Sequence, residues 1–376
     1  MSSIFRALVF LMFVLNSRAF ASQWRTETLS NWQMGSNQSF VAQTSDGWVL
    51  PLYRFTPRVA AHAAERNLPP VVLFHGMGAN RFNLAQTGPS NLAVWLASRG
   101  RDVFVVELRG AGRSVDLTPG SNTESKWEFD FDTYREKDVP AILSRIKEIT
   151  GSPEVDWVGH SMGGMLLYAI AGHDGGFSGD VRVRRAVAIA SPGMIEGLPL
   201  RVGVMLRLAT IFPSNQLPNR LWLQTVSLFY PDFVPDNEAS LGFKTNYDPM
   251  FARAFVANVG ANVSRGLARQ IHAWHGRGGI FSRDGLVNYT ADLAKSSVPI
   301  RFIGASKDYL ASQASVQKAF DAAGGEKKLT FLGKGFGNER DYGHTDVVAG
   351  RFAALDSFPL VESWLSESAA RIARKD

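Results

Sequence analysis

A serine between two glycines carries the strongest chemical signal in the sequence. The segment Gly159-His160-Ser161-Met162-Gly163 follows the apolar run 155–158 and precedes a helical pattern that begins at Met165. A G-x-S-x-G pattern at a strand-to-helix turn holds the serine in a strained conformation, and its glycines leave room for the turn. Such a turn exposes Oγ and points the N–H of Met162 toward a developing oxyanion. The spacing therefore predicts that Ser161 is a nucleophile.

A serine nucleophile needs a base, and the chain offers seven histidines. His160 adjoins the serine and cannot turn back to it, whereas His344 lies in a loop after the last expected strand. We therefore expect His344 to be the base. The other histidines receive different expectations: solvated loop positions for His62 and His173, a separate glycine-rich motif for His75, and packing or surface roles rather than metal binding for His272 and His275.

The base needs a carboxylate to orient it, and three aspartates compete for that role. Asp308 follows an expected strand at 299–303, and the chain order serine, aspartate, histidine suits a sheet of this kind. Asp341 and Asp346 lie close to His344 in the sequence. We interpret Asp346 as a cap or first-turn residue of the next helix and favour Asp308, for which the alternative is an ordinary turn aspartate.

A second oxyanion donor is expected after the first central strand. Phe74-His75-Gly76-Met77-Gly78 ends that strand, and its glycines allow the backbone to approach a substrate. The N–H of Met77 is the candidate donor, beside that of Met162; the alternative is a glycine-rich turn that only ends a strand. The pattern implies no metal and no organic cofactor.

The elements around these residues alternate between strand and helix. Expected strands form a hairpin at 39–55 and apolar runs at 70–74, 102–106, 155–158, 186–190, 299–303 and 329–332, with helical spacing at 88–99 and 134–149. Alternation of this kind predicts an α/β fold with a doubly wound, mostly parallel sheet.

Residues 192–290 interrupt the alternation. They contain amphipathic stretches at 200–212 and 250–274 and many large apolar side chains. A hundred-residue crossover would be unusually long, so we interpret 192–290 as a helical cap inserted into a core of 22–191 and 291–376. The alternative is that these helices simply cover the sheet.

The N-terminus and the composition bear on localisation. Arg6, the short apolar run 7–15 and Ala19-Phe20-Ala21 predict a secretory signal at 1–21, cleaved before Ser22; an uncleaved anchor is the alternative. Without Arg6 and Arg18 the formal charge of +6 falls to +4, and no basic stripe suggests nucleic-acid binding. We interpret the cluster 182–185 as a solvated strand entrance. The chain has no cysteine, which excludes disulfides and thiol chemistry and favours a secreted or periplasmic bacterial protein.

Several blocks resemble the acid lipases, the gastric and lysosomal lipase family of the α/β-hydrolase superfamily. They are 75–77, 127–141, 158–161, Gly304 with Asp308, and 342–348, and they cover about a third of the chain. The resemblance implies an α/β-hydrolase fold, a triad of Ser161, Asp308 and His344, and a lid over a lipid or ester site. Met162 stands where those lipases usually have glutamine, and the cap matches poorly, so the triacylglycerol substrate does not carry over.

These observations predict a serine hydrolase that cleaves carboxylic esters through an acyl-enzyme. Acyl transfer to another acceptor would use the same triad, and a non-catalytic binding protein on this scaffold is the third reading. The expected partners are a small-molecule or lipid ester and, through the cap, a transient lipid interface. We expect no nucleic acid and no membrane span after removal of the signal.

Overall fold

The computed structural model describes residues 38–57, 68–86, 90–117, 123–229, 242–247 and 249–367. The expected signal segment 1–21, His62 and the basic tail after 367 lie outside these ranges.

One mixed sheet organises the described residues. Along its main path the strands follow the order β1-β2-β4-β3-β6-β8-β11-β12, with β5 paired to β2 and β7 to β8. Their bounds are β1 Gln38–Gln43, β2 Trp48–Phe55, β3 Val71–Phe74, β4 Val103–Val106, β5 Val115–Asp116, β6 Glu154–His160, β7 Phe177–Ser178, β8 Val181–Ile189, β11 Ile300–Ala305 and β12 Lys327–Leu332.

The sheet is parallel from β4 to β12 and antiparallel where β1, β2 and β4 meet. Every residue of β3, β4 and β11 is buried, so helices cover both faces of the central strands. The predicted α/β architecture with a doubly wound, mostly parallel sheet is confirmed, and the strand positions agree to within a few residues.

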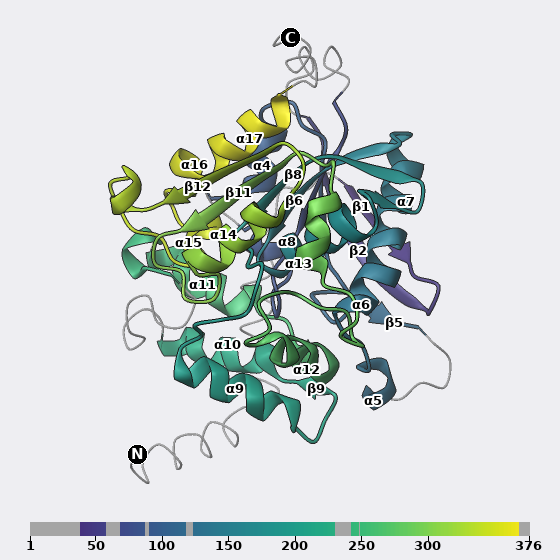
Figure 1. The fold of residues 1–376 in the computed structure, drawn as a ribbon, viewed down its shortest axis with the longest axis vertical. Coiled ribbons are helices and arrows are strands. Elements are labelled where there is room, and N and C mark those ends of the chain that lie inside the picture. Colours follow the sequence, from purple (N-terminus) through teal and green to yellow (C-terminus); the bar gives the residue numbers. More distant parts are fainter. Residues whose placement is uncertain are drawn as a thin grey trace. The chain divides into compact units, whose positions relative to one another are not determined.

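Helices flank the sheet in two groups (Figure 1). Helices α4 and α17 contact each other and the strands, whereas α8 and α14 pack on other parts of the sheet. Helix α14 contacts α13 directly, and α8 continues into the helical turn 169–173, which also contacts α13. The helices of this part are α4 Leu92–Ala97, α5 Thr123–Lys126, α6 Phe131–Thr133, α7 Val139–Thr150, α8 Met162–Tyr168, α13 Tyr289–Asp292, α14 Gln313–Ala322, α15 Asp346–Ala349, α16 Ala353–Asp356 and α17 Phe358–Ser366.

The segment between β8 and α13 is mainly helical where it is described. Figure 1 shows α9, α10 and α12 together at one end of the sheet. The bounds are α9 Leu200–Thr210, β9 Gln216–Leu217, α10 Asn219–Phe229, α11 Pro249–Val259, β10 Val263–Ser264 and α12 Arg265–Trp274. No helix among the described residues combines enough length and apolar character to cross a bilayer. The division of the chain into a core and a cap stays a prediction.

The expected continuous helical stretch at 250–274 is wrong. The chain leaves the helix after Val259, forms the short strand β10, and pairs it with β9 through Val263 and Leu217. The hydroxyl of Ser264 then accepts the N–H of Leu267 at 3.1 Å and starts α12. Strand pairing and a new N-cap therefore divide one apolar pattern into two helices.

The basic cluster at 182–185 is only partly a solvated strand entrance. Arg182 is exposed, but Arg184 donates two hydrogen bonds to the buried carboxylate of Asp156, at 2.8 and 2.6 Å. Arg185 is buried, with its guanidinium 4.3 Å from the ring centroid of Trp364. Two of the three arginines thus hold the start of β8 in place rather than face solvent.

Candidate active site

Ser161 occupies a strained turn between β6 and α8. Its backbone angles are φ 53° and ψ −117°, a region that residues with side chains rarely adopt. The two glycines of the motif are required because a side chain at either position would collide with neighbouring backbone, not because either has a positive φ. A Cβ at Gly159 would lie 2.3 Å from the carbonyl carbon of Gly163, and a Cβ at Gly163 would lie 2.3 Å from the carbonyl oxygen of Phe74. Close packing of strand and helix therefore enforces the predicted pattern and leaves Ser161 partly exposed.

Asp308 and His344 meet although 36 positions separate them in the chain. Asp308 follows β11, and His344 lies in the loop between β12 and α15. Nδ1 of His344 donates to Oδ2 of Asp308 at 2.7 Å, and both side chains are buried. The other carboxylate oxygen, Oδ1, accepts the N–H groups of Leu310 at 2.8 Å and Ala311 at 2.9 Å. These bonds orient the imidazole and leave its Nε2 as the basic atom.

The surroundings of Asp308 favour its charged form. Burial alone would raise the pKa of this carboxyl, but the charge and hydrogen bond of His344, together with the two N–H groups, lower the pKa below its ordinary value. An ionised Asp308 can therefore stabilise an imidazolium at His344.

The competing aspartates have other partners. Asp341 accepts the hydroxyl of Ser306 at 2.8 Å and the N–H of Lys334 at 3.1 Å. Asp346 lies in the first turn of α15, as expected, where burial raises its pKa to about 6. It accepts the N–H groups of Gly343 at 2.7 Å and Phe243 at 3.0 Å. Of the three carboxylates, Asp308 is the one that contacts the ring of His344.

His160 links the serine turn to the histidine loop. Its ring centroid lies 4.8 Å from that of His344, and its Nε2 lies 2.9 Å from the carbonyl oxygen of His344. Burial, and then the positive charge of His344, lower the pKa of His160 to about 3. His160 therefore contacts the candidate base through its ring. That ring is neutral, and its two nitrogens face Oδ1 of Asn83 and the main-chain carbonyl of His344 rather than the hydroxyl of Ser161.

The candidate oxyanion loop approaches the serine from the end of β3. A Cβ on Gly76 would lie 3.2 Å from Cβ of Ser161, so the backbone passes close to the nucleophile. Within the described part of the chain, the N–H groups of Met77 and Met162 donate to no protein acceptor. Two N–H groups without acceptors beside a serine suit the stabilisation of an oxyanion.

Residues between β8 and α13 also hold this loop. Nδ2 of Asn219 donates to the carbonyls of Gly78 at 3.1 Å and Ala261 at 2.9 Å. Ala261 in turn donates its N–H to Gly78 at 2.8 Å, and Gly78 has φ 64°. The conformation of the candidate oxyanion loop thus depends on contacts with residues about 140 and 180 positions away.

The structure describes four more histidines, of which His75 lies in the candidate oxyanion loop. His75 is buried, donates Nδ1–H to Gly76 at 2.8 Å and accepts the N–H of Leu108 at 3.2 Å. His173 is paired with Asp292, while His272 and His275 are exposed at the end of α12. The described ranges contain no group of three or more side chains suited to hold a metal ion.

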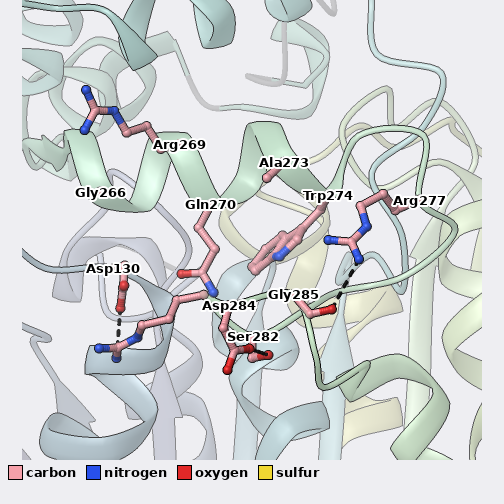
Figure 2. A pocket seen from close by; sticks show the side chains of 11 residues that line it. Asp130, Gly266, Arg269, Gln270, Ala273, Trp274, Arg277, Ser282, Asp284 and Gly285 are labelled. Carbon is pink, nitrogen blue, oxygen red and sulfur yellow. Dashed lines mark hydrogen bonds and ion pairs between the residues drawn. The ribbon is translucent and has the colours of Figure 1, made fainter.

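A cavity of about 340 Å³ lies elsewhere, between α12 and the loop 281–288 (Figure 2). Its wall includes Trp274, Arg269, Arg277 and Arg283, the last paired with Asp130. Ser161, Asp308 and His344 do not line it, so we do not assign it to the substrate.

Sequence reasoning missed the polar residues that support the site. Asn83 accepts the N–H of Gly76 at 3.0 Å, and Asn219 fixes Gly78. Both are single asparagines in segments without a motif, and their partners lie on other elements. The sequence carries no local signal for either role.

Comparisons with known proteins agree with this architecture. A family model described as the alpha/beta hydrolase fold matches residues 69–255. Rat gastric triacylglycerol lipase is 34% identical over 131 residues, which are 34% of this chain and 32% of the lipase. Human lysosomal acid lipase/cholesteryl ester hydrolase is 31% identical over 140 residues, 37% of this chain and 35% of the relative. The matches thus span about a third of the length of these curated relatives.

A solved structure extends the likeness over most of the chain. The enol-lactonase from Burkholderia xenovorans superposes with a TM-score of 0.55 at 16% identity and covers 87% of this chain and 100% of its own. At this identity the likeness concerns the fold alone.

Proposed function

The chain is an α/β hydrolase with similarity to the acid lipases, and we propose that it hydrolyses carboxylic esters. In this proposal Ser161 is the nucleophile, His344 the general base and Asp308 the residue that orients it. The observation that carries the proposal is the buried hydrogen bond between Asp308 and His344, together with the contact of His344 with His160, the residue before the strained Ser161.

The proposed reaction has two halves. In the first, Oγ of Ser161 attacks the ester carbonyl while Nε2 of His344 takes its proton, and the N–H groups of Met77 and Met162 bind the oxyanion. The alcohol leaves with the proton from His344, and an acyl-enzyme remains on Ser161. In the second, His344 takes a proton from water, whose oxygen attacks the acyl carbon. The bond from the acyl carbon to Oγ of Ser161 then breaks, His344 returns the proton to Oγ, and the acid leaves.

The test is a pair of serine variants assayed with p-nitrophenyl butyrate and a fluorophosphonate probe. Ser161→Ala should lose turnover and labelling while it keeps the melting temperature of the wild type. Ser98→Ala, which removes an exposed hydroxyl after α4, should change neither. Full activity or labelling of Ser161→Ala would show that Ser161 is not the nucleophile.

We also propose that the inserted segment contacts a lipid surface through α9. Leu200, Val204, Leu208 and Ile211 recur at helical spacing and are 85%, 47%, 57% and 73% exposed. Helix α9 also contacts α12, and the side chains opposite the stripe, Val202, Leu206 and Ala209, are half-buried. Helix α9 is therefore apolar on both sides, which is unusual for a helix that faces water.

The charge around this stripe suits an anionic membrane surface. No acidic residue occurs between Glu196 and Asp232, whereas Arg201 and Arg207 occur in this stretch of the sequence. Leu208→Glu should weaken sedimentation with vesicles that contain phosphatidylglycerol, and Leu286→Glu, at an 84% exposed loop position, should not. Equal binding of both variants would contradict the proposal.

Export is proposed on the pattern at 1–21, which lies outside the described residues. The mature protein should begin at Ser22 and be recovered from the periplasm or the medium. A mature protein that retains Met1 or Arg6 by mass spectrometry would contradict cleavage.

A further inference from the structure

Two buried polar side chains, Asn83 and His160, lie between the candidate oxyanion loop and the loop of His344. Each is 2% exposed. Neither belongs to the triad, and polar groups at this depth need hydrogen-bond partners. Their partners belong to the two loops whose relative position the reaction requires.

Asn83 hydrogen-bonds the candidate oxyanion loop. Its Oδ1 accepts the N–H of Gly76 at 3.0 Å and lies 2.9 Å from Nδ1 of His160. Since Gly76 donates, the oxygen of the amide is the atom that faces both partners. Asn83 itself is fixed at the end of a short 3₁₀ helix, whose cap Asn80 accepts the N–H of Phe82 at 3.0 Å.

His160 contacts the loop that carries His344. Its Nε2 lies 2.9 Å from the main-chain carbonyl of His344. Both ring nitrogens of His160 therefore face an oxygen that can only accept. A neutral imidazole has one N–H, so the contacts with Asn83 and with His344 compete for one proton.

We propose that Asn83 and His160 are positioning residues that set the oxyanion loop and the main chain of His344 relative to each other. The inference rests on the proposed ester hydrolysis and adds two residues to it. Asn83 acts on the N–H of Met77 through the adjacent Gly76. His160 acts on Nε2 of His344 through the main chain that carries the ring.

The consequence should fall on the chemical step. A displacement of about 1 Å at a reacting group can cost about 100-fold in rate without loss of substrate affinity. Loss of either side chain should therefore lower kcat and leave KM nearly unchanged. A residue that only stabilises the fold would lower the melting temperature with little change in kcat.

The experiment compares Asn83→Ala and His160→Leu with Asn91→Ala. Asn91 is a matched control because it is also a buried asparagine, 5% exposed, whose side chain accepts one backbone N–H at the start of α4. All three should lower the melting temperature by similar amounts. Only Asn83→Ala and His160→Leu should lower kcat for p-nitrophenyl butyrate, by about tenfold or more, with KM within about twofold.

A fourth variant keeps the inference testable if a truncated side chain prevents folding. The amide of His160→Gln can donate to the carbonyl of His344, so this variant should be faster than His160→Leu by about threefold or more. Values of kcat within twofold of the wild type in both Asn83→Ala and His160→Leu would overturn the inference, as would equal rates for the glutamine and leucine variants. A wild-type protein with neither turnover nor fluorophosphonate labelling would instead overturn the proposed function, and the inference with it.

Discussion

Replacement of Asp308 by asparagine tests the proposed triad most directly. The side chain keeps its size, and its Oδ1 can still accept the N–H groups of Leu310 and Ala311, now at 2.8 and 2.9 Å. These two bonds fix the oxygen of the new amide, so its NH₂ group must take the place of Oδ2, which lies 2.7 Å from Nδ1 of His344. An NH₂ group donates there, so Nδ1 must accept and the ring proton must move to Nε2.

That tautomer cannot act as the base, because Nε2 no longer has a free lone pair for the proton of Ser161. A wrong tautomer of this kind lowers kcat by about 10³- to 10⁴-fold, or about 4 to 5.5 kcal/mol of transition-state stabilisation. The loss should appear in kcat for p-nitrophenyl butyrate at pH 7. The fold should change little, because both backbone hydrogen bonds remain.

Asp341→Asn is the matched control. Asp341 is close to His344 in sequence but bonds to Ser306 and to the N–H of Lys334. Its kcat should stay within about threefold of the wild type. If Asp308→Asn keeps more than a tenth of the activity, or if Asp341→Asn loses as much as Asp308→Asn, the assignment of the acid is refuted.

Two other perturbations follow from the structure. Burial raises the pKa of Asp346 to about 6, so folding favours its protonated form and its contribution to the free energy of unfolding should fall between about pH 4 and 6. The lowered pKa values of His160 and Asp308 act in the opposite sense, so this contribution is isolated by comparison with Asp346→Asn. The free energy of unfolding of the wild type relative to that variant should fall over this range, and a relative rise would contradict the reasoning. Gly159→Ala places a Cβ 2.3 Å from the backbone of Gly163 and should destabilise the fold by about 3 kcal/mol or more in urea denaturation. Gly335→Ala meets nothing within 4 Å and should be neutral, and equal midpoints for the two would disprove the packing argument.

The strands and the serine turn could be predicted because their signals are local. The apolar runs mark strands buried on both faces, and the glycines around Ser161 are required by contacts that recur wherever this turn occurs. Asp308 could be favoured among three aspartates from its place after an expected strand and from chain order. The choice depends on which carboxylate the fold brings to His344, and the sequence shows the order of these residues but not their distance.

The supporting contacts could not be predicted, because each joins distant segments. Asn83 and His160 are 77 positions apart, and Asn219 lies 141 positions from Gly78. Gly260 directly follows the end of α11 at Val259 and is a local stop signal that sequence reasoning missed, whereas strand β10 forms only by pairing with β9. The spacing of apolar residues indicates which face of a segment is buried. It does not indicate which other segment packs against that face.

The hydrogen bonds from Asn219 and Ala261 to Gly78 have a consequence for protein engineering. Segments that sit over hydrolase sites are attractive units to exchange between enzymes when a new specificity is sought. Here such an exchange would also remove two hydrogen bonds to Gly78 in the loop bearing Met77, and the bond between Asn219 and Ala261 that joins the two donors. A chimera that replaces residues 192–290 as a block should therefore lose turnover before it gains a new preference, unless the graft supplies an asparagine at position 219 and the backbone of 260–261 in the same place.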